Sequence, residues 1–214
     1  MQKIKAVFFD MDGTVLDTEP IHAVAFGQAL EKLGIKDGVG FLSRCIGLNV
    51  PEMRKLFMRE VGTEAEFDKI NALAWEIADK LKKQHGIKVK QGFFELAESL
   101  SENGVKAYIV TSTPRKPALR DLETAGIAGY FVDFICFGDY EKGKPAPEPY
   151  LKALKLSGEN ADECIAIEDS EAGLTSAVSA GLRCVLVRDM AVIPEETARL
   201  AYADLKTLAD LIDL

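Results

Sequence analysis

The chain alternates between short apolar runs and segments whose apolar residues recur every three or four positions. The first run, residues 4–9, is mostly β-branched and aromatic, which is typical of a central strand covered on both faces. Similar runs predict four further strands at residues 105–110, 134–137, 164–167 and 183–187. Helical spacing predicts helices at residues 93–101, 117–125, 149–156, 172–180 and 205–211. Strands and helices that alternate in this way favour a parallel α/β sheet.

A long helical segment separates the first strand from the others. Between residues 19 and 88 we find no convincing strand, and apolar spacing predicts helices from Ile21 to Leu33, from Pro51 to Val61 and from Thr63 toward Gly86. We therefore expect two domains, with hinges near residues 17–18 and 90–92. They are an α/β core domain of residues 1–17 and 90–214, and a small helical cap domain of residues 18–89 inserted over the C-terminal edge of the sheet.

Two carboxylates follow the first strand. Asp10 and Asp12 point the same way in extended backbone, beyond the strand end where open α/β sheets bind ligands. At roughly 4 Å and an effective dielectric near 20, two such charges repel by about 4 kcal/mol, which a cation, a proton or exposure to water could offset. We favour a cation and a proton, because the pair then supplies a nucleophile and an acid/base. An Asp-rich turn is the alternative, since Asp-Gly is a common turn signal.

Polar side chains also follow three later strands. They are Thr111 with Ser112, Lys144, and Glu168 with Asp169. Each has a structural explanation: Thr-Ser often caps a helix, Lys-Pro often forms a surface turn, and acidic residues are favoured before a helix. Because the carboxyl ends of parallel strands meet at one edge of a sheet, we nevertheless expect these side chains to lie near Asp10 and Asp12 and to form one site.

Composition narrows the classes of function. The 214 residues are 48% hydrophobic and 28% charged, as in ordinary globular proteins, and the net charge of −8 offers no electrostatic footprint for nucleic acid or an anionic membrane. Four cysteines without CxxC spacing are expected to be buried, reduced thiols. With no long apolar window and no leader pattern, we expect a cytoplasmic protein. A monomer is the expected state, with an oligomer left open.

Four motifs, taken together, resemble those of the haloacid dehalogenase superfamily. They are residues 10–18, 110–112, 143–148 and 167–173, in the order of that family and over the whole chain. The resemblance implies a Rossmann-like parallel sheet core. The helical insertion is similar to the small cap of the β-phosphoglucomutase and phosphoglycolate phosphatase-like group.

The same resemblance implies roles for the residues at the strand ends. Asp10 would be the nucleophile that forms an aspartyl-phosphate, and Asp12 would be the acid/base. Thr111, the amide of Ser112 and Lys144 would bind the phosphoryl oxygens. The implied Mg²⁺ ligands are Asp10, the backbone carbonyl of Asp12, Asp169 and, directly or through water, Glu168.

Charge independently favours a metal. The carboxylates and a dianionic phosphate outweigh the single charge of Lys144, so a phosphate would be repelled without a divalent cation. An oxygen-only ligand set suits Mg²⁺ rather than zinc. Asp12 argues against dehalogenation, because a true haloacid dehalogenase lacks the second aspartate and needs no metal.

We therefore expect a Mg²⁺-dependent phosphatase whose partner is a small phosphorylated metabolite, a sugar or polyol phosphate. A β-phosphoglucomutase-like phosphohexomutase is the alternative, and a non-catalytic phosphate-binding protein is a third. In the mutase, a cap arginine that grips the distal phosphate follows shortly after a glycine corresponding to Gly47. Val50 stands where that arginine would fall, which argues against the mutase.

Candidate substrate residues lie in the helical segment. Arg44 or Arg54 could replace the missing arginine, although a solvated helix charge is the favoured interpretation of each. His22 matches a histidine near the hinge of the mutase group, and is equally well explained as a polar residue in the first turn of a helix. Asn49 is a further candidate. Trp75 is expected to pack in the core of the cap, with a substrate platform as the alternative.

Overall fold

The structure is a computed structural model that describes residues 4–35, 38–45, 48 and 50–211. It divides into two compact units, which we name by their content. The core unit comprises residues 1–17, 88–189 and 193–214, and the helical unit comprises residues 18–87 and 190–192. Residues 88 and 89, predicted to lie in the cap domain, belong to the core unit, and residues 190–192, predicted to lie in the core domain, belong to the helical unit.

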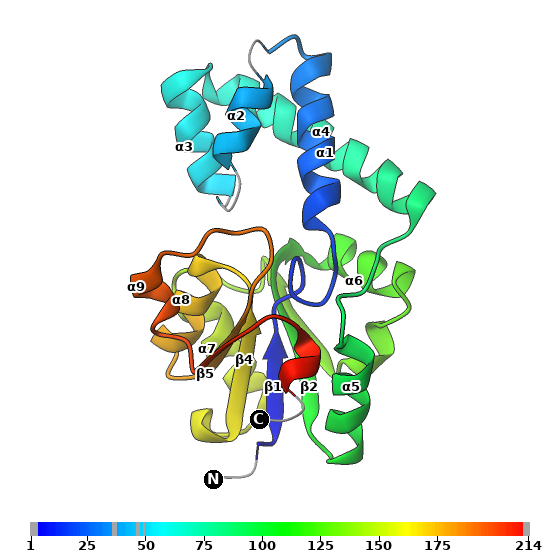
Figure 1. Ribbon diagram of the computed structural model, residues 1–214, viewed down its shortest axis with the longest axis vertical. Helices are drawn as coiled ribbons and strands as arrows, with labels where there is room; N and C mark the ends of the chain where they lie inside the picture. The colour runs from blue at the N-terminus through cyan, green and yellow to red at the C-terminus, as the bar shows by residue number, and fades with distance from the viewer. Residues whose placement is uncertain (1–3, 36–37, 46–47, 49, 212–214) are drawn as a thin grey trace. The chain divides into compact units, whose positions relative to one another are not determined.

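The core unit is built on a six-stranded, fully parallel sheet (Figure 1), which confirms the predicted α/β class. The strand order is β3-β2-β1-β4-β5-β6, so β1 lies inside the sheet between β2 and β4. The strands are β1 (Ala6–Phe9), β2 (Lys106–Pro114), β3 (Asp133–Phe137), β4 (Cys164–Glu168), β5 (Arg183–Val187) and β6 (Ala203–Leu205).

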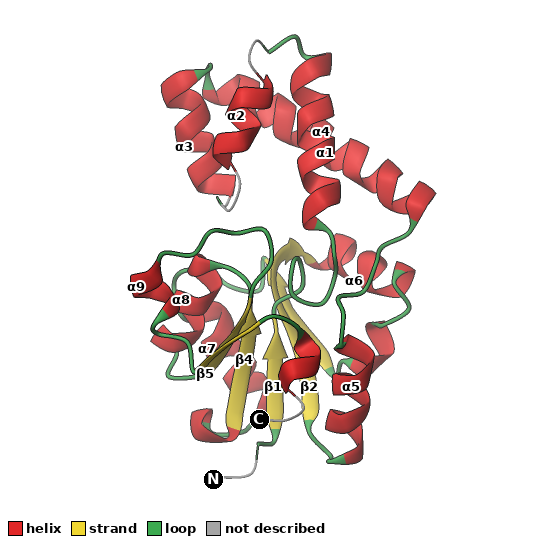
Figure 2. Ribbon diagram, in the orientation of Figure 1, coloured by secondary structure: helices red, strands yellow, loops and turns green. Residues whose placement is uncertain are grey.

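Helices cover both faces of this sheet, with α5 and α6 on the side opposite α7 and α8 (Figure 2). Phe8 packs in a buried cluster with Tyr150 of α7 and Leu174 of α8. Its neighbour Phe9 points to the other face, where its ring meets Phe93 of α5 at a centroid distance of 6.2 Å. Coverage on both faces explains why β1 is a continuous apolar run. The core helices are α5 (Phe93–Glu102), α6 (Arg115–Thr124), α7 (Glu148–Ser157), α8 (Glu171–Ser179) and α9 (Glu195–Ala198), with 3₁₀ turns at Ala128–Tyr130, Ala161–Glu163 and Leu208–Leu211.

Two core segments differ from the predicted elements. Strand β2 continues past Val110 to Pro114, with a register shift against β3, so the Thr-Ser pair lies within the strand rather than after it. The helix predicted at residues 205–211 is wrong, because residues 203–205 form β6 and only a 3₁₀ turn follows. Pairing with β6 satisfies backbone groups along the edge of β5, and this outweighs the helical spacing of a short apolar segment.

The described residues of the helical unit form four helices around an apolar core of their own. They are α1 (Glu19–Lys32), α2 (Gly38–Cys45), α3 (Val50–Glu60) and α4 (Glu64–His85). The capping box predicted at the start of α4 is present, with the Glu66 amide donating to Thr63 Oγ1 at 3.3 Å and the Thr63 amide donating to Glu66 Oε2 at 2.7 Å. Four aromatic rings from the four helices pack together in the core: Phe26, Phe41, Phe57 and Phe67.

Helix α2 was not predicted from the sequence. Gly38 and Gly40 lower its intrinsic helix propensity, and its eight residues are too few for a clear periodic signal. Tertiary packing stabilises it instead, because Phe41 is fully buried and its ring meets that of Phe57 at 5.4 Å.

Two segments of the core unit run antiparallel where the helical insertion leaves and returns. Leu16 bridges to Val89, the Asp17 amide donates to the Lys88 carbonyl at 2.9 Å, and the Lys90 amide donates to the Val15 carbonyl at 3.0 Å. Among the helices in the described parts of the chain, none is long and apolar enough to cross a membrane.

Candidate active site

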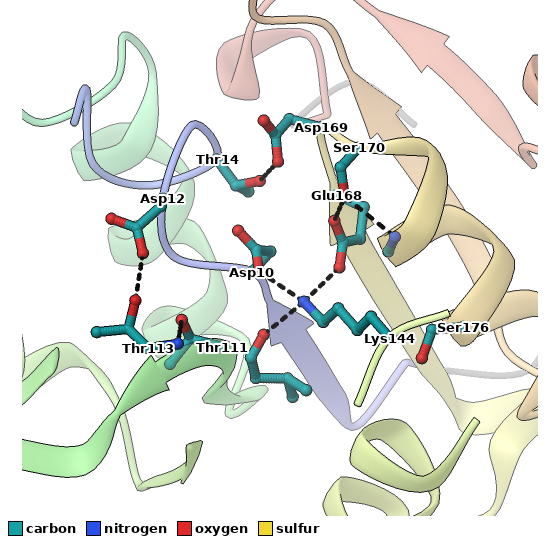
Figure 3. A network of polar contacts seen from close by, with 12 residues as sticks. Asp10, Asp12, Thr14, Thr111, Thr113, Lys144, Glu168, Asp169, Ser170 and Ser176 are labelled. Carbon is teal, nitrogen blue, oxygen red and sulfur yellow. Dashed lines mark hydrogen bonds and ion pairs between the residues drawn. The ribbon is translucent and has the colours of Figure 1, made fainter. Parts of the chain in front are cut away.

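Three residues that are far apart in the sequence meet in one buried ion-pair network (Figure 3). Asp10 follows β1, Glu168 ends β4, and Lys144 lies in the loop between β3 and α7. The Lys144 Nζ donates to Asp10 Oδ1 and to Glu168 Oε1, each at 2.6 Å, and to the Val110 carbonyl oxygen at 2.8 Å. The Lys144 side chain is only 5% exposed and that of Glu168 is fully buried. The structure thus brings the ends of β1 and β4 into contact through one lysine.

Burial and charge set the protonation of this network. Burial raises the pKa of Asp10 well above its usual range, while Lys144 opposes the rise and Glu168 adds to it. Burial alone would lower the pKa of Lys144, but the two carboxylates outweigh it and hold that pKa above the value of a free lysine. The ammonium therefore stays charged at neutral pH and places a fixed positive charge beside Asp10.

Glu168 is held by donors that the sequence analysis missed. Tyr150 Oη donates to Glu168 Oε1 at 2.6 Å, and Ser170 Oγ donates to Oε2 at 3.2 Å. A methyl group on Gly173 would overlap the Glu168 carboxyl, which explains why a glycine occupies that position at the start of α8. Nothing in the sequence marks Tyr150, because it is one of several apolar residues at helical spacing in α7. Both oxygens of Glu168 are therefore fixed by neighbouring donors.

Asp12 lies in a different environment from Asp10. Thr113 Oγ1 donates to Asp12 Oδ2 at 2.8 Å, and the Thr113 amide donates to Thr111 Oγ1 at 3.0 Å. Thr111 and Thr113 are buried while Ser112 between them is exposed, as the alternation of a strand requires. A lysine thus contacts one aspartate and a neutral hydroxyl contacts the other. Carboxylates in unlike surroundings can take different roles in proton transfer.

The acidic residues at this edge of the sheet fit a divalent cation. Asp10, Glu168 and Asp169 each offer a carboxylate oxygen, and these oxygens lie within 4.8 Å of one another. Thr14 Oγ1 donates to Asp169 Oδ1 at 3.1 Å and so orients that carboxyl. At Gly13 the φ of +83° suits glycine, and a Cβ there would overlap the Asp169 carboxyl. An oxygen-only donor set of this kind suits a hard cation such as Mg²⁺.

The family follows from comparison with known proteins. The model of the family described as haloacid dehalogenase-like hydrolase matches residues 7–187, which is most of the chain. The chain belongs to the haloacid dehalogenase-like hydrolases. The resemblance carried by the four sequence motifs is therefore confirmed.

Relatives of this haloacid dehalogenase-like hydrolase include named phosphatases. It is 33% identical over 182 residues to the phosphorylated carbohydrates phosphatase of Thermotoga maritima, covering 84% of this chain and 82% of that protein. It is 27% identical over 224 residues to pyrophosphatase PpaX of Halalkalibacterium halodurans, covering 99% and 97%. The crystal structure of CbbY from Rhodobacter sphaeroides in complex with phosphate is similar with a TM-score of 0.78 and 26% identity, covering 99% of this chain and 100% of that chain.

A cavity of about 140 Å³ lies within the helical unit of the hydrolase, and His22 and Trp75 are among its lining residues. Their rings meet edge to face at a centroid distance of 5.2 Å. Trp75 is half-buried and lies outside the buried aromatic cluster, and Phe26 and Ala74 of the apolar core line the same cavity. Glu19 and Asn71 add polar groups to a lining that is otherwise mostly apolar.

The two arginines considered for substrate binding are held in ion pairs on the helical unit. Arg44 pairs with Glu60 at 3.1 Å, and Arg54 pairs with Glu64 at 3.1 Å and with Asp68 at 2.7 Å. Neither arginine is among the residues that line the cavity. Asn49 and Gly47 lie outside the described residues.

Proposed function

We propose that this hydrolase is a Mg²⁺-dependent phosphatase of a small phosphorylated metabolite, a sugar or polyol phosphate, and that it works through an aspartyl-phosphate. The observation that carries the proposal is the buried Lys144 between Asp10 and Glu168, with a second aspartate in a separate hydrogen bond nearby. Nucleophilic attack on a phosphate ester requires a carboxylate nucleophile, a fixed positive charge beside it and a nearby acid/base. Asp10, the Lys144 ammonium and Asp12 can supply these three groups. The names of the phosphatase relatives support the same chemistry.

The two aspartates divide the reaction between them. A carboxylate oxygen of Asp10 attacks phosphorus, the bond between phosphorus and the ester oxygen breaks, and Asp12 gives its proton to that leaving oxygen. In the second step Asp12 takes a proton from water, the water oxygen attacks phosphorus, and inorganic phosphate leaves while the Asp10 carboxylate is restored. General acid–base catalysis of this kind contributes typically about 10²- to 10⁴-fold in rate.

Positive charge and hydrogen-bond donors stabilise the transferring group. Lys144 faces Asp10 at 2.6 Å and would contact the phosphoryl oxygens there. Thr111 and the Ser112 amide, on the neighbouring strand, would donate to the same oxygens. The three N–H donors of the Lys144 ammonium are taken by Asp10, Glu168 and the Val110 carbonyl, so its contribution to the transition state would come chiefly from its fixed positive charge.

A bound Mg²⁺ would supply the remaining positive charge at this site. We propose that Asp10, the backbone carbonyl of Asp12 and Asp169 hold it. Glu168 is better placed to act through water than directly, because Lys144, Tyr150 and Ser170 already donate to its oxygens. Divalent cations of this class keep several waters when bound to proteins.

Two features weigh against the phosphohexomutase alternative. A mutase must bind a second phosphate, yet among the described residues no lysine or arginine lines the cavity of the helical unit. Arg44 and Arg54, which could have replaced the missing arginine, are neutralised by glutamates.

A non-catalytic phosphate-binding protein would have no need of an acid/base, whereas Asp12 is present and hydrogen-bonded.

A hydrolysis panel tests the proposal. Release of inorganic phosphate would be measured with Mg²⁺ for sugar phosphates, polyol phosphates and pyrophosphate, and again in excess EDTA. We expect release from sugar or polyol phosphates, its loss in EDTA, and its return when Mg²⁺ is restored. Selective hydrolysis of pyrophosphate would reassign the substrate. Isomerisation of glucose 1-phosphate that depends on a bisphosphate activator and releases no phosphate would show that the protein is a mutase rather than a phosphatase. Full activity in EDTA would contradict the proposed Mg²⁺ dependence.

A further inference from the structure

Asp189, just beyond β5, is a largely buried carboxylate that none of the four motifs includes. Its side chain is 11% exposed, and its Oδ1 accepts a hydrogen bond from Lys90 Nζ at 2.7 Å. Its other oxygen, Oδ2, is buried and has no hydrogen-bond partner in the described structure. A buried carboxylate oxygen without a donor is costly, so this one calls for a partner that the described residues do not provide.

The unpaired oxygen lies close to Gly13 and so to Asp169, one of the proposed cation ligands. A Cβ built on Gly13 would overlap Asp169 Oδ2 and would lie 3.2 Å from Asp189 Oδ2. The two carboxylate oxygens therefore border the same small space, which exists because residue 13 has no side chain. The other oxygen of Asp169 accepts a hydrogen bond from Thr14, and the other oxygen of Asp189 accepts one from Lys90. Both carboxyls are thus anchored with one oxygen each turned toward that space.

Two facing carboxylate oxygens repel unless positive charge or a hydrogen-bond donor lies between them. A water molecule bound to a divalent cation is such a donor, and Mg²⁺ usually keeps several of its waters in proteins. We propose that Asp189 is a positioning residue of the cation site, whose Oδ2 accepts a hydrogen bond from a cation-bound water while Lys90 fixes its Oδ1. This inference rests on the cation of the proposed function and adds a carboxylate that the family motifs do not contain.

Direct measurement of metal binding tests the inference without any turnover. Binding of Mn²⁺, a cation of similar oxygen preference, would be followed through the electron paramagnetic resonance signal of the free ion. Asp189→Asn should weaken binding about tenfold, the lower end of the effect typical of outer-sphere partners. Asp204→Asn is the matched control, because it removes the same charge from an exposed pair with Arg188 in the same unit, and it should bind as the wild type does.

A third variant separates positioning from a structural role. Lys90→Met leaves the Asp189 carboxylate in place but removes both a positive charge and the donor that fixes its Oδ1, so Mn²⁺ binding should weaken less than in Asp189→Asn. If the Asp189–Lys90 pair mattered only for folding, Asp189→Asn and Lys90→Met would weaken binding alike and lower the melting temperature alike, which would overturn the inference.

The Mn²⁺ affinities of Asp189→Asn and of the wild type each give a further test. Wild-type affinity in Asp189→Asn would show that Asp189 does not act on the cation and would leave the proposed phosphatase intact. An absence of Mn²⁺ binding by the wild type would instead contradict the cation site itself, and with it the metal dependence of the proposed function. The two failures are therefore distinguishable in one titration series.

Discussion

At the scale of single residues, Lys144 shows how a buried charge can be used. Its ammonium is removed from water but contacts two carboxylates and a carbonyl, so the charge is compensated. The carboxylates keep its pKa above that of a free lysine, despite a burial that acts in the opposite direction. The residue therefore carries a permanent positive charge beside the proposed nucleophile throughout the neutral pH range.

Thr113 is a second residue whose role follows from one contact. Thr113→Val removes the hydroxyl that donates to Asp12, so the proposed acid/base loses its orientation. We expect kcat to fall about tenfold with little change in KM, a fraction of what general acid–base catalysis contributes. Steady-state kinetics on the best substrate of the panel would measure it. Thr113→Ser keeps the hydroxyl and should remain within about twofold of the wild type; equal losses in both variants would contradict the role.

At the scale of elements, the carboxyl ends of β1, β2 and β4 build the site. Apolar runs in the sequence predict these strands, and the reactive side chains at the ends of the runs, such as Asp10 and Glu168, predict the site. It also predicted the parallel sheet, because strands and helices alternate after residue 90. Regular periodicity in long segments was therefore sufficient to predict the class of the fold.

The remaining features depend on contacts between distant residues, which a local pattern does not encode. Helix α2 is stabilised by aromatic packing, and β6 forms because it pairs with β5. The partners of the site residues were missed for the same reason: the Asp12–Thr113 hydrogen bond joins the loop after β1 to β2, and the Glu168–Tyr150 hydrogen bond joins β4 to α7. Residues such as Tyr150 and Thr113 look ordinary in sequence, and only the fold reveals what they contact.

The close packing of α8 against the end of β4 can be tested at Gly173. Gly173→Ala places a methyl group inside the Glu168 carboxyl, so Glu168 must shift and its contact with Lys144 must weaken. We expect a loss of about 1–3 kcal/mol in the free energy of unfolding, together with a loss of activity. Gly129→Ala is the matched control, since a Cβ there meets nothing within 4 Å. Unchanged stability and activity in Gly173→Ala would contradict the close packing.

At the scale of the whole molecule, the interior of the core unit shields its cysteine thiols from solvent. Its three described cysteines are free and buried, and they lie on β3, β4 and β5: Cys136, Cys164 and Cys184. Burial raises the pKa of the Cys136 thiol and of the Cys164 thiol to about 11. A thiol with a raised pKa stays protonated up to a higher pH, so the reactive thiolate is scarce in the native protein.

Alkylation measures that protection. At pH 8, three units below a pKa of about 11, only about one thiol in a thousand is ionised. We expect iodoacetamide to label Cys136 and Cys164 very slowly in the native protein and completely after unfolding in guanidinium. Mass spectrometry of the digested protein would follow each site. Rapid labelling of either cysteine in the native state would show that the sheet opens more readily than the packing indicates.

Net charge also acts at this scale. The chain carries −8 and its proposed substrate is an anion, so attraction must come from the site itself rather than from the protein as a whole. Lys144 and the proposed cation supply it locally. Binding of substrate is therefore expected to depend strongly on the metal.

The central claim is that Asp10 attacks the phosphate ester, and one measurement tests it most directly. Inorganic phosphate release by the wild type and by Asp10→Asn would be compared with saturating Mg²⁺, on the substrate the wild type hydrolyses best. A melting curve for each protein would show that the variant is folded. Because the amide cannot serve as the nucleophile, the account predicts steady release by the wild type and none above the uncatalysed background by a folded Asp10→Asn protein. Release by that variant at the wild-type rate would contradict it.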